Sequence, residues 1–447
     1  MNSAFVDYYR CPPTFVDLQL DGGLSEDSGY FLFGPGAVCY GRTASGWRSD
    51  HVNGSLWDAR AAQAGRGALP FDLTEVIDNL RCERYFTDAQ TTQNSSAKAA
   101  LKKAYYLLRP LLGVAVRKHL QKIYLKDWES LRFPHWPVDF SVEHLLERAL
   151  ALLLGSGRAA SMPFIWFWPE GRLGSVMMTH DVETAAGRDF CERLMDLNDS
   201  FGVKSAFQIV PEKRYSVPRA FLNNIQKRGF EVNVHGLDHD GNLFGDRKRF
   251  LQQAERINRH AREYGALGFR SPVLYRNVDW FEALDFSYDM SIPNVAHLDP
   301  QRGGCCTVMP YFINDMLELP LTTTQDYSLF NVLDDYSIAL WQKQIGLILE
   351  RYGLLSFIVH PDYIIAEKNR AVYAALLQHL TDLALQKNLW LALPQEINAW
   401  WRQRRQLKLV RQEGRWQIEG PGSARARVAH AMLVEGRIEY KIDESQS

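Results

Sequence analysis

Two carboxylates follow an apolar segment in the stretch GSVMMTHDVETAAG, residues 174–187. Residues typical of a buried strand lead there into a polar run that contains Asp181 and Glu183. A charge buried at the end of a strand needs a partner, such as a metal ion, a basic side chain or a substrate. Because side chains alternate along a strand, Asp181 and Glu183 point to one face, where one could bind a metal and the other act as a base. The alternative interpretation is an acid-rich helix N-terminus, since VETAAGRDF begins a helix.

A pair of histidines with metal-ligand spacing occurs in VNVHGLDHD, where His235 and His239 are four residues apart. If the chain turns helically after its strand, both imidazoles project from one face, roughly 5–6 Å apart at Cβ. Two imidazole nitrogens at that separation can share one Zn²⁺. The spacing alone is equally compatible with surface or core histidines. Asp240, next to His239, could orient a ligand histidine.

Two further polar residues follow apolar runs. His360 comes after LLSFIV and precedes Pro361 and Asp362, and a histidine beside a carboxylate suits a proton donor. Arg270 in GFRSP could pair with the base or bind an anion. A purely structural role is the alternative for both His360 and Arg270.

The elements that must position these residues lie between about 163 and 400, where short apolar runs alternate with helical stretches. This alternation predicts a parallel sheet, open or closed into a barrel. The candidate polar residues follow the strand runs directly, and the carboxyl ends of barrel strands are where active sites are built. The expected strand runs are FIWFW, GSVMMT, SAFQIV, FEVNVH, LGFR, LLSFIVH and LWLAL.

Three regions are predicted along the chain: an N-terminal accessory region over 1–162, the α/β region over 163–402, and a small β appendage over 403–447. Residues 1–70 show short strand-like pieces, and the pattern from about 73 to 155 is helical. Helices are expected over 95–125, with a break or kink at Pro110, and over 141–157. The appendage is too short for its own core, so we expect it to pack on the barrel or pair with the N-terminal strands.

Composition excludes several classes of function. The net charge of −1 indicates neither nucleic acid nor an anionic membrane as a partner. We expect no transmembrane segment and no signal peptide, and therefore a cytoplasmic protein. The six cysteines form no CxxC pair and are expected to be reduced thiols. The tryptophans at 166, 168, 400 and 401 suit sugar binding, but core packing is the favoured interpretation.

Taken in order, Asp181, FEVNVHGLDH, GFRSPVLY and SFIVHPDY resemble the motif series of the polysaccharide deacetylases, the NodB-homology domain of carbohydrate esterase family 4. The resemblance implies an α/β fold, a distorted (β/α)7 barrel, here with a mainly helical N-terminal region and the antiparallel β appendage. It implies hydrolysis of N-acetyl, or sometimes O-acetyl, groups of amino sugars with Zn²⁺ or a similar divalent ion. In the implied roles Asp181 is the general base, His360 the general acid and Arg270 the residue that holds Asp181, while His235 and His239 bind the metal.

The chain departs from the common first motif, in which two aspartates are adjacent, because Val182 occupies the second position. THDVE resembles instead the subset with a D-x-D or D-x-E spacing, so Glu183 is predicted to be the third metal ligand. Some relatives with altered first motifs act on small cyclic amides. SYDMSIPN and LELPLTT also resemble segments of this superfamily, and Asp289 and Glu318 within them line the site or serve strand-end structure.

The predicted function is therefore a metal-dependent hydrolase that removes an acetyl group from a sugar or glycan precursor. The expected cofactor is Zn²⁺ and the expected partner is an acylated carbohydrate. Two alternatives stay open at this point: an amidohydrolase for small non-sugar amides, and a catalytically silent glycan-binding or scaffold protein.

Overall fold

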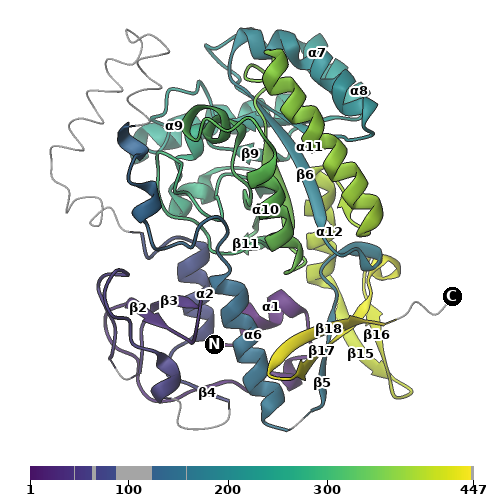
Figure 1. Ribbon diagram of the computed structural model, residues 1–447. Coiled ribbons are helices and arrows are strands. Elements are labelled where there is room, and N and C mark those ends of the chain that lie inside the picture. The colour runs from purple at the N-terminus through teal and green to yellow at the C-terminus, as the bar shows by residue number, and fades with distance from the viewer. Residues whose placement is uncertain (45, 63–66, 87–122, 158, 444–447) are drawn as a thin grey trace.

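The computed structural model describes residues 1–44, 46–62, 67–86, 123–157 and 159–443. Its centre is a mixed α/β arrangement around one curled sheet of nine strands, shown in Figure 1. The strand order is β11-β12-β10-β9-β8-β7-β6-β13, and β14 pairs with the start of β6. The strands are β6 (Ser175–Val182), β7 (Ala206–Ile209), β8 (Glu231–His235), β9 (Gly268–Arg270), β10 (Tyr288–Asp289), β11 (Tyr311–Ile313), β12 (Met316–Glu318), β13 (Leu354–Ile358) and β14 (Trp390–Leu391).

Parallel pairing is the rule in this sheet. Every neighbouring pair is parallel except β11 with β12. All residues of β6, β7, β8 and β13 are buried, as expected for strands covered on both faces. The expected alternation of strands and helices is thus present, whereas the exact seven-stranded barrel stays a prediction.

The helices that connect these strands begin and end at recognisable signals. Thr184 caps α7 by accepting a hydrogen bond from the backbone N–H of Gly187, and Asp246 caps α9 in the same manner. Gly265 ends α9 in a left-handed conformation. The helices are α7 (Ala185–Ser200), α8 (Arg219–Lys227), α9 (Arg247–Tyr264), α10 (Ala339–Leu349), α11 (Glu367–Gln386) and α12 (Pro394–Gln406).

The strand register places the candidate residues at one edge. Asp181 is paired with Gln208 across β6 and β7, and His235 is paired with Arg270 across β8 and β9. Because parallel strands end on the same side, the residues that end β6, β8, β9 and β13 meet at the carboxyl edge of the sheet.

The N-terminal region contains helices and short strands. The helix expected over 141–157 is present as α6, whereas most of the helix expected over 95–125 lies outside the described residues. The mainly helical character expected of this region stays a prediction, as do the three predicted domain boundaries. The elements are α1 (Ser3–Tyr9), β1 (Gln19–Leu20), β2 (Gly29–Leu32), β3 (Val38–Gly41), β4 (Ala68–Leu69), α2 (Leu73–Arg81), α6 (Ser141–Gly155) and β5 (Ser161–Ile165).

The C-terminal appendage consists of two antiparallel hairpins. β17 pairs with β5 as well as with β18, so the appendage extends a strand that precedes the central sheet, and α6 lies against the same hairpin (Figure 1). A second core, separate from the one under the sheet's helices, joins the appendage to the N-terminal region. The strands are β15 (Lys408–Gln412), β16 (Arg415–Glu419), β17 (Val428–Val434) and β18 (Arg437–Ile442).

Aromatic side chains fill this second core. The hydroxyl oxygens of Tyr9 and Tyr440 are 2.9 Å apart, and both rings contact Phe164. Trp166, Trp168, Trp400 and Trp401 are buried, as the core interpretation predicts. Among the described residues, no helix combines the length and the apolar character needed to cross a bilayer.

Candidate active site

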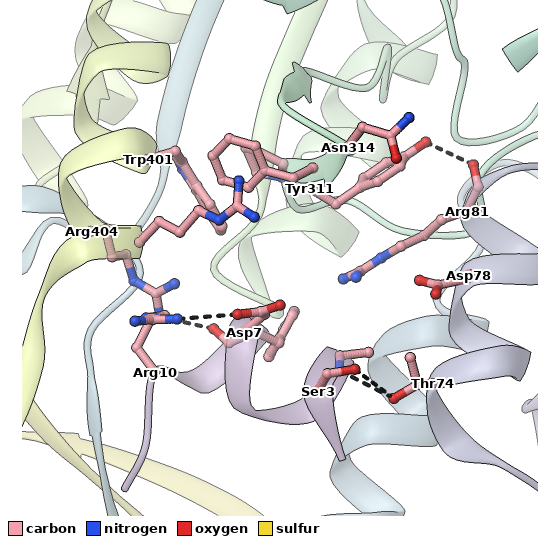
Figure 2. A pocket seen from close by; sticks show the side chains of 15 residues that line it. Ser3, Asp7, Arg10, Thr74, Asp78, Arg81, Tyr311, Asn314, Trp401 and Arg404 are labelled. Carbon is pink, nitrogen blue, oxygen red and sulfur yellow. Dashed lines mark hydrogen bonds and ion pairs between the residues drawn. The ribbon is translucent and has the colours of Figure 1, made fainter. Parts of the chain in front are cut away.

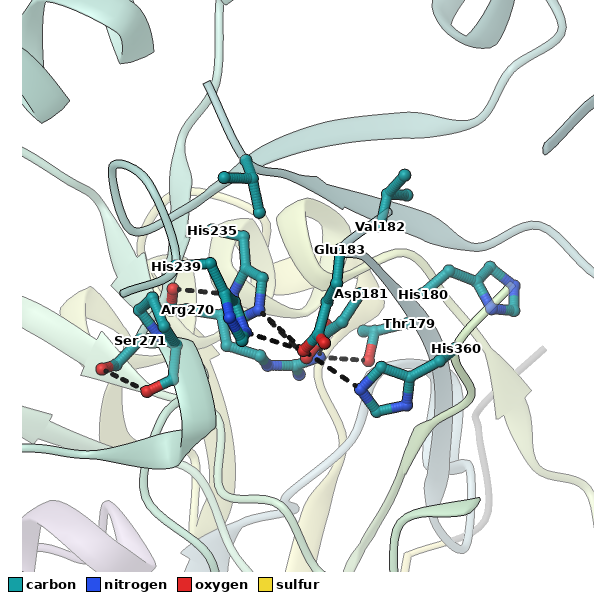
Figure 3. A network of polar contacts seen from close by, with 12 residues as sticks. Thr179, His180, Asp181, Val182, Glu183, His235, His239, Arg270, Ser271 and His360 are labelled. Carbon is teal, nitrogen blue, oxygen red and sulfur yellow. Dashed lines mark hydrogen bonds and ion pairs between the residues drawn. The ribbon is translucent and has the colours of Figure 1, made fainter. Parts of the chain in front are cut away.

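At the end of β6, alternate side chains point to the hydrophobic core and to a polar cluster. Val182 is fully buried in the hydrophobic core, whereas Asp181 and Glu183 point the other way, toward the histidines (Figure 3). The capped start of α7 directly after Thr184 keeps Glu183 at the strand's end. The valine therefore takes no part in the polar cluster, and the two acids share one face as the alternation predicts.

Both histidines of the H-x-x-x-H motif lie against Glu183. Its Oε1 is 2.8 Å from Nε2 of His239 and 3.6 Å from Nε2 of His235, and the two imidazole rings are 5.0 Å apart between centroids. The chain does not turn helically after β8. A bend with positive φ at Gly236 and His239 brings the two rings together instead. A side chain at Gly236 would place its Cβ 2.3 Å from Cγ of Pro272.

A backbone carbonyl beside His235 fixes which ring nitrogen carries the hydrogen. Its Nδ1 lies 3.1 Å from the carbonyl oxygen of Arg270, so Nδ1–H donates there and the lone pair of Nε2 faces Glu183. Nε2 of His235 and Nδ1 of His239 are buried without a hydrogen-bond partner, and Nε2 of His239 is within ion-pair distance of Glu183 but does not have the geometry of a hydrogen bond. Burial lowers the pKa of His239, which favours the neutral imidazole that binds metals.

These groups fit a divalent metal ion. Ligand atoms of Glu183, His235 and His239 lie within 4.8 Å of one another. Two orphaned imidazoles and one carboxylate form the nitrogen and oxygen donor set that Zn²⁺ accepts. Burial opposes ionisation of Glu183, but the facing histidines hold its pKa well below the ordinary value.

Asp181 is held by a buried arginine. Oδ1 of Asp181 accepts a hydrogen bond of 2.7 Å from Nη1 of Arg270, which also donates to Oγ1 of Thr179 at 2.7 Å. Nε of Arg270 donates to the carbonyl of Met290, and the arginine side chain is fully buried. Burial raises the pKa of Asp181, yet Arg270 outweighs it and leaves that pKa below the ordinary value. The carboxylate is therefore ionised at neutral pH.

His360 is held by a carboxylate that the sequence did not indicate. Nδ1 of His360 lies 2.6 Å from Oδ1 of Asp326, and the backbone N–H of His360 donates to Oδ2 at 2.8 Å. Within the described part of the chain, Asp326 and not the expected neighbour Asp362 forms the hydrogen bond with the ring. Burial alone would lower the pKa of His360, but Asp326 and Glu183 raise it well above the ordinary value. Its free Nε2 points at Glu183, 3.5 Å from Oε1 (Figure 3).

The remaining candidates are held outside this cluster. Asp240 pairs with Arg249 and caps a turn at Asn242, rather than contacting His239. Asp289 and Glu318 face each other across β10 and β12, and burial raises the pKa of both. The backbone N–H and the hydroxyl of Ser291 donate to Asp289, and the backbone N–H of Ile292 donates to Oε1 of Glu318, so the pair braces the two strands.

Comparison with known proteins gave matches among solved structures. No family model matches the chain, and no curated protein matches its sequence. A polysaccharide deacetylase of Mycobacterium smegmatis, described as putative, matches with a TM-score of 0.43 and 19% identity over 53% of this chain and 93% of that one. The peptidoglycan deacetylase PdaC of Bacillus subtilis matches with a TM-score of 0.33 and 13% identity, covering 52% and 92%.

A third match is a putative polysaccharide deacetylase involved in O-antigen biosynthesis from Bordetella bronchiseptica, with a TM-score of 0.31 and 17% identity over 51% of this chain and 84% of that one. These proteins are described as deacetylases of the kind that the motif series resembles, and each match covers about half of this chain. The D-x-E variant of the first motif stays a prediction. With TM-scores below 0.5, these matches support no statement about the chemistry of this chain. The chemistry follows from the side chains themselves.

Proposed function

We propose that this chain is a metal-dependent hydrolase that removes an N-acetyl or O-acetyl group from a sugar or glycan precursor. The proposal is supported by the meeting of three kinds of group at one place: a candidate base, a candidate acid and a set of candidate metal ligands. An arginine-held carboxylate, Asp181, and a carboxylate-held imidazole, His360, face the same cluster of Glu183, His235 and His239. The carbohydrate substrate comes from the motif resemblance.

Glu183, His235 and His239 would hold the ion. Zn²⁺ is the metal that we propose, because its preferred ligands include imidazole nitrogen and carboxylate oxygen. A divalent ion there would supply Lewis acidity to the acyl carbonyl and to the attacking water.

Asp181 is the proposed general base. Its Oδ1 is occupied by Arg270, and Oδ2 lies 3.8 Å from Nε2 of His235, so the second oxygen is directed at the ligand cluster. An ionised carboxylate at that point can take the proton of the water that attacks the acyl carbon. Arg270 positions this carboxylate and keeps it charged.

His360 is the proposed general acid. An amine leaves a tetrahedral intermediate only when it is protonated, and Asp326 keeps a proton on the imidazole. Figure 3 shows His360 approaching Glu183 from the side opposite to His235 and His239. Base and acid can therefore act on different parts of one substrate.

The test combines metal analysis with acetate release. Protein purified without chelators should contain about one divalent ion per chain, release acetate from N-acetylated glucosamine oligomers, and lose that activity with a chelator. His235→Gln should lose both metal and activity, whereas the matched variant His51→Gln, at an exposed position, should keep both.

Two results would overturn the proposal. Metal-free protein with no chelator-sensitive hydrolysis, but with glycan binding, would indicate a silent binding protein. Hydrolysis of small cyclic amides without any action on acetylated sugars would indicate the amidohydrolase.

A further inference from the structure

A second polar cavity lies away from the catalytic cluster. It has a volume of about 260 Å³ and is enclosed by α1, α2, β11 and α12 (Figure 2). Helix α12 crosses the amino ends of the strands, because the backbone N–H of Gln395 donates to Glu231 at the start of β8 and Asn398 donates to Ser287 just before β10. The cavity is therefore at the end of the sheet opposite to Asp181 and His360.

Positive charge exceeds negative charge around this cavity. Four arginines and two aspartates line it, a formal excess of two positive charges. Asp7 pairs with Arg10 at 3.1 Å, and burial raises the pKa of Asp78, which weakens its counter-charge. The arginines are Arg10, Arg81, Arg404 and Arg405.

Two of these arginines form no ion pair with a carboxylate of the described residues. Within that part of the chain, Arg404 donates to the backbone carbonyls of Tyr8, Ile165 and Trp166 at 2.7 to 3.0 Å. Arg81 is 8% exposed, and no carboxylate of the described residues is recorded within 4 Å of its guanidinium. Figure 2 shows its side chain extending toward the centre of the lining residues, and its charge lies 5.2 Å from the centroid of the Tyr311 ring.

The residues that line the cavity contain buried polar atoms without a hydrogen-bond partner, and all of these atoms are donors. Among the lining residues, the buried polar side-chain atoms without a partner are Nε of Arg10, Nε of Arg81 and Nε1 of Trp401. A buried donor without an acceptor costs free energy, and a buried guanidinium without an anion costs more. A ligand that brings negative charge into the cavity would offset the unpaired positive charge of these arginines.

We propose that this cavity binds a small phosphate monoester, with the phosphate at Arg81. Guanidinium groups match phosphate oxygens in geometry and charge. The rings of Tyr8, Tyr311 and Trp401 supply an apolar wall for the organic part of the ester. The volume lies just below the range of about 300–1,000 Å³ of most small-molecule sites, which suits a sugar phosphate rather than a nucleotide.

Binding would join three regions of the chain. The lining comes from α1 and α2 of the N-terminal region, from β11 of the central sheet and from α12. A ligand that binds only the folded chain raises the unfolding temperature with its concentration. The cavity therefore provides a means by which a phosphorylated metabolite stabilises the contact between the N-terminal region and the sheet.

The experiment uses the full chain, with thermal unfolding and titration calorimetry against glucose 6-phosphate, inorganic phosphate and glucose. We expect the ester to raise the unfolding temperature at millimolar concentration, inorganic phosphate to bind more weakly, and glucose to have no effect. Arg81→Met should weaken ester binding at least tenfold, whereas the matched variant Arg84→Met, three residues further and exposed, should leave it unchanged.

A second variant guards against misfolding of the first. Arg405→Gln changes a partly exposed side chain at the rim and should weaken ester binding several-fold without altering the fold. The proposal is overturned if no phosphate compound binds, if the ester binds Arg81→Met as tightly as the unchanged chain, or if inorganic phosphate binds as tightly as the ester.

Discussion

At the carboxyl end of the sheet the guanidinium of Arg270 pairs with the carboxylate of Asp181 at 2.7 Å, whereas at the opposite end the guanidinium of Arg81 pairs with no carboxylate of the described residues. Both arginines are buried. Beside the first arginine, the buried atoms without a hydrogen-bond partner are imidazole nitrogens of His235 and His239 and Nη2 of Arg270 itself. Among the residues that line the second cavity, they are N–H donors only.

The contrast between these two arginines shows how the surroundings of a buried charge indicate what it binds. A charge satisfied within the chain, as in Asp181 and Arg270, positions a side chain. Lone pairs beside a carboxylate call for a cation, and donors beside excess positive charge call for an anion. The two ends of one sheet are thus suited to ligands of opposite charge.

The largest expected effect is that of Asp181→Asn, which removes the proposed base and keeps the side-chain shape. Acetate release should fall by about a thousandfold, within the range of general-base catalysis, while the bound metal is retained. Asp240→Asn is the control, since Asp240 pairs with Arg249 outside the cluster. Loss of metal from Asp181→Asn would show that Asp181 is itself a ligand.

Arg270→Met should leave Asp181 buried without its cation. Removing one partner of such a pair costs about 3–5 kcal/mol of unfolding free energy, measurable by urea denaturation at neutral pH. Because the folded pKa of Asp181 is lowered, the stabilisation from the pair is present above the ordinary aspartate pKa and is lost as pH falls through the lowered value. The difference between the two proteins should therefore narrow in acid, and a constant difference would contradict the electrostatic cause.

Asp326→Asn tests the source of the proton on His360. Asp326 raises the pKa of His360, and the protonated form is the proposed acid, so activity should fall as pH rises through that pKa. Without the carboxylate the pKa drops, and the alkaline limb of the pH–rate profile should move to lower pH, with activity at neutral pH reduced about tenfold or more. Asp362→Asn is the control. If the alkaline limb moved in Asp362→Asn and not in Asp326→Asn, Asp362 would be the carboxylate that keeps the proton on His360.

The smallest expected effect is on the stability of Arg81→Met in buffer without phosphate. Replacement by an apolar side chain removes no ion pair among the described residues, and it removes only a weaker attraction of Arg81 for Asp78 and Glu143. The unfolding free energy should therefore change by less than about 1 kcal/mol. Urea denaturation of Arg81→Met and Arg270→Met under the same conditions compares the two changes in unfolding free energy directly. A cost equal to that of Arg270→Met would show that Arg81 has a partner within the chain and would remove the main support for the anion site.

Much of the candidate site could be predicted from local pattern. Asp181, His235, Arg270 and His360 each follow an apolar strand run, and parallel strands bring such ends to one edge. The side-chain alternation also predicts that Val182 turns away from Glu183. The bend at Gly236 could not be predicted from the four-residue histidine spacing, which is compatible with a helix as well.

The amino-acid sequence by itself determined the alternation of strands and helices and the residues that stand at the strand ends, because both depend on side-chain periodicity over a few neighbours. Only the tertiary structure decided that Asp326 holds His360, that β17 pairs with β5, and that Arg81 lies in a cavity with Arg404. These contacts join segments far apart in the chain. Which distant surfaces meet depends on the packing free energy of the whole fold, and no local pattern records it.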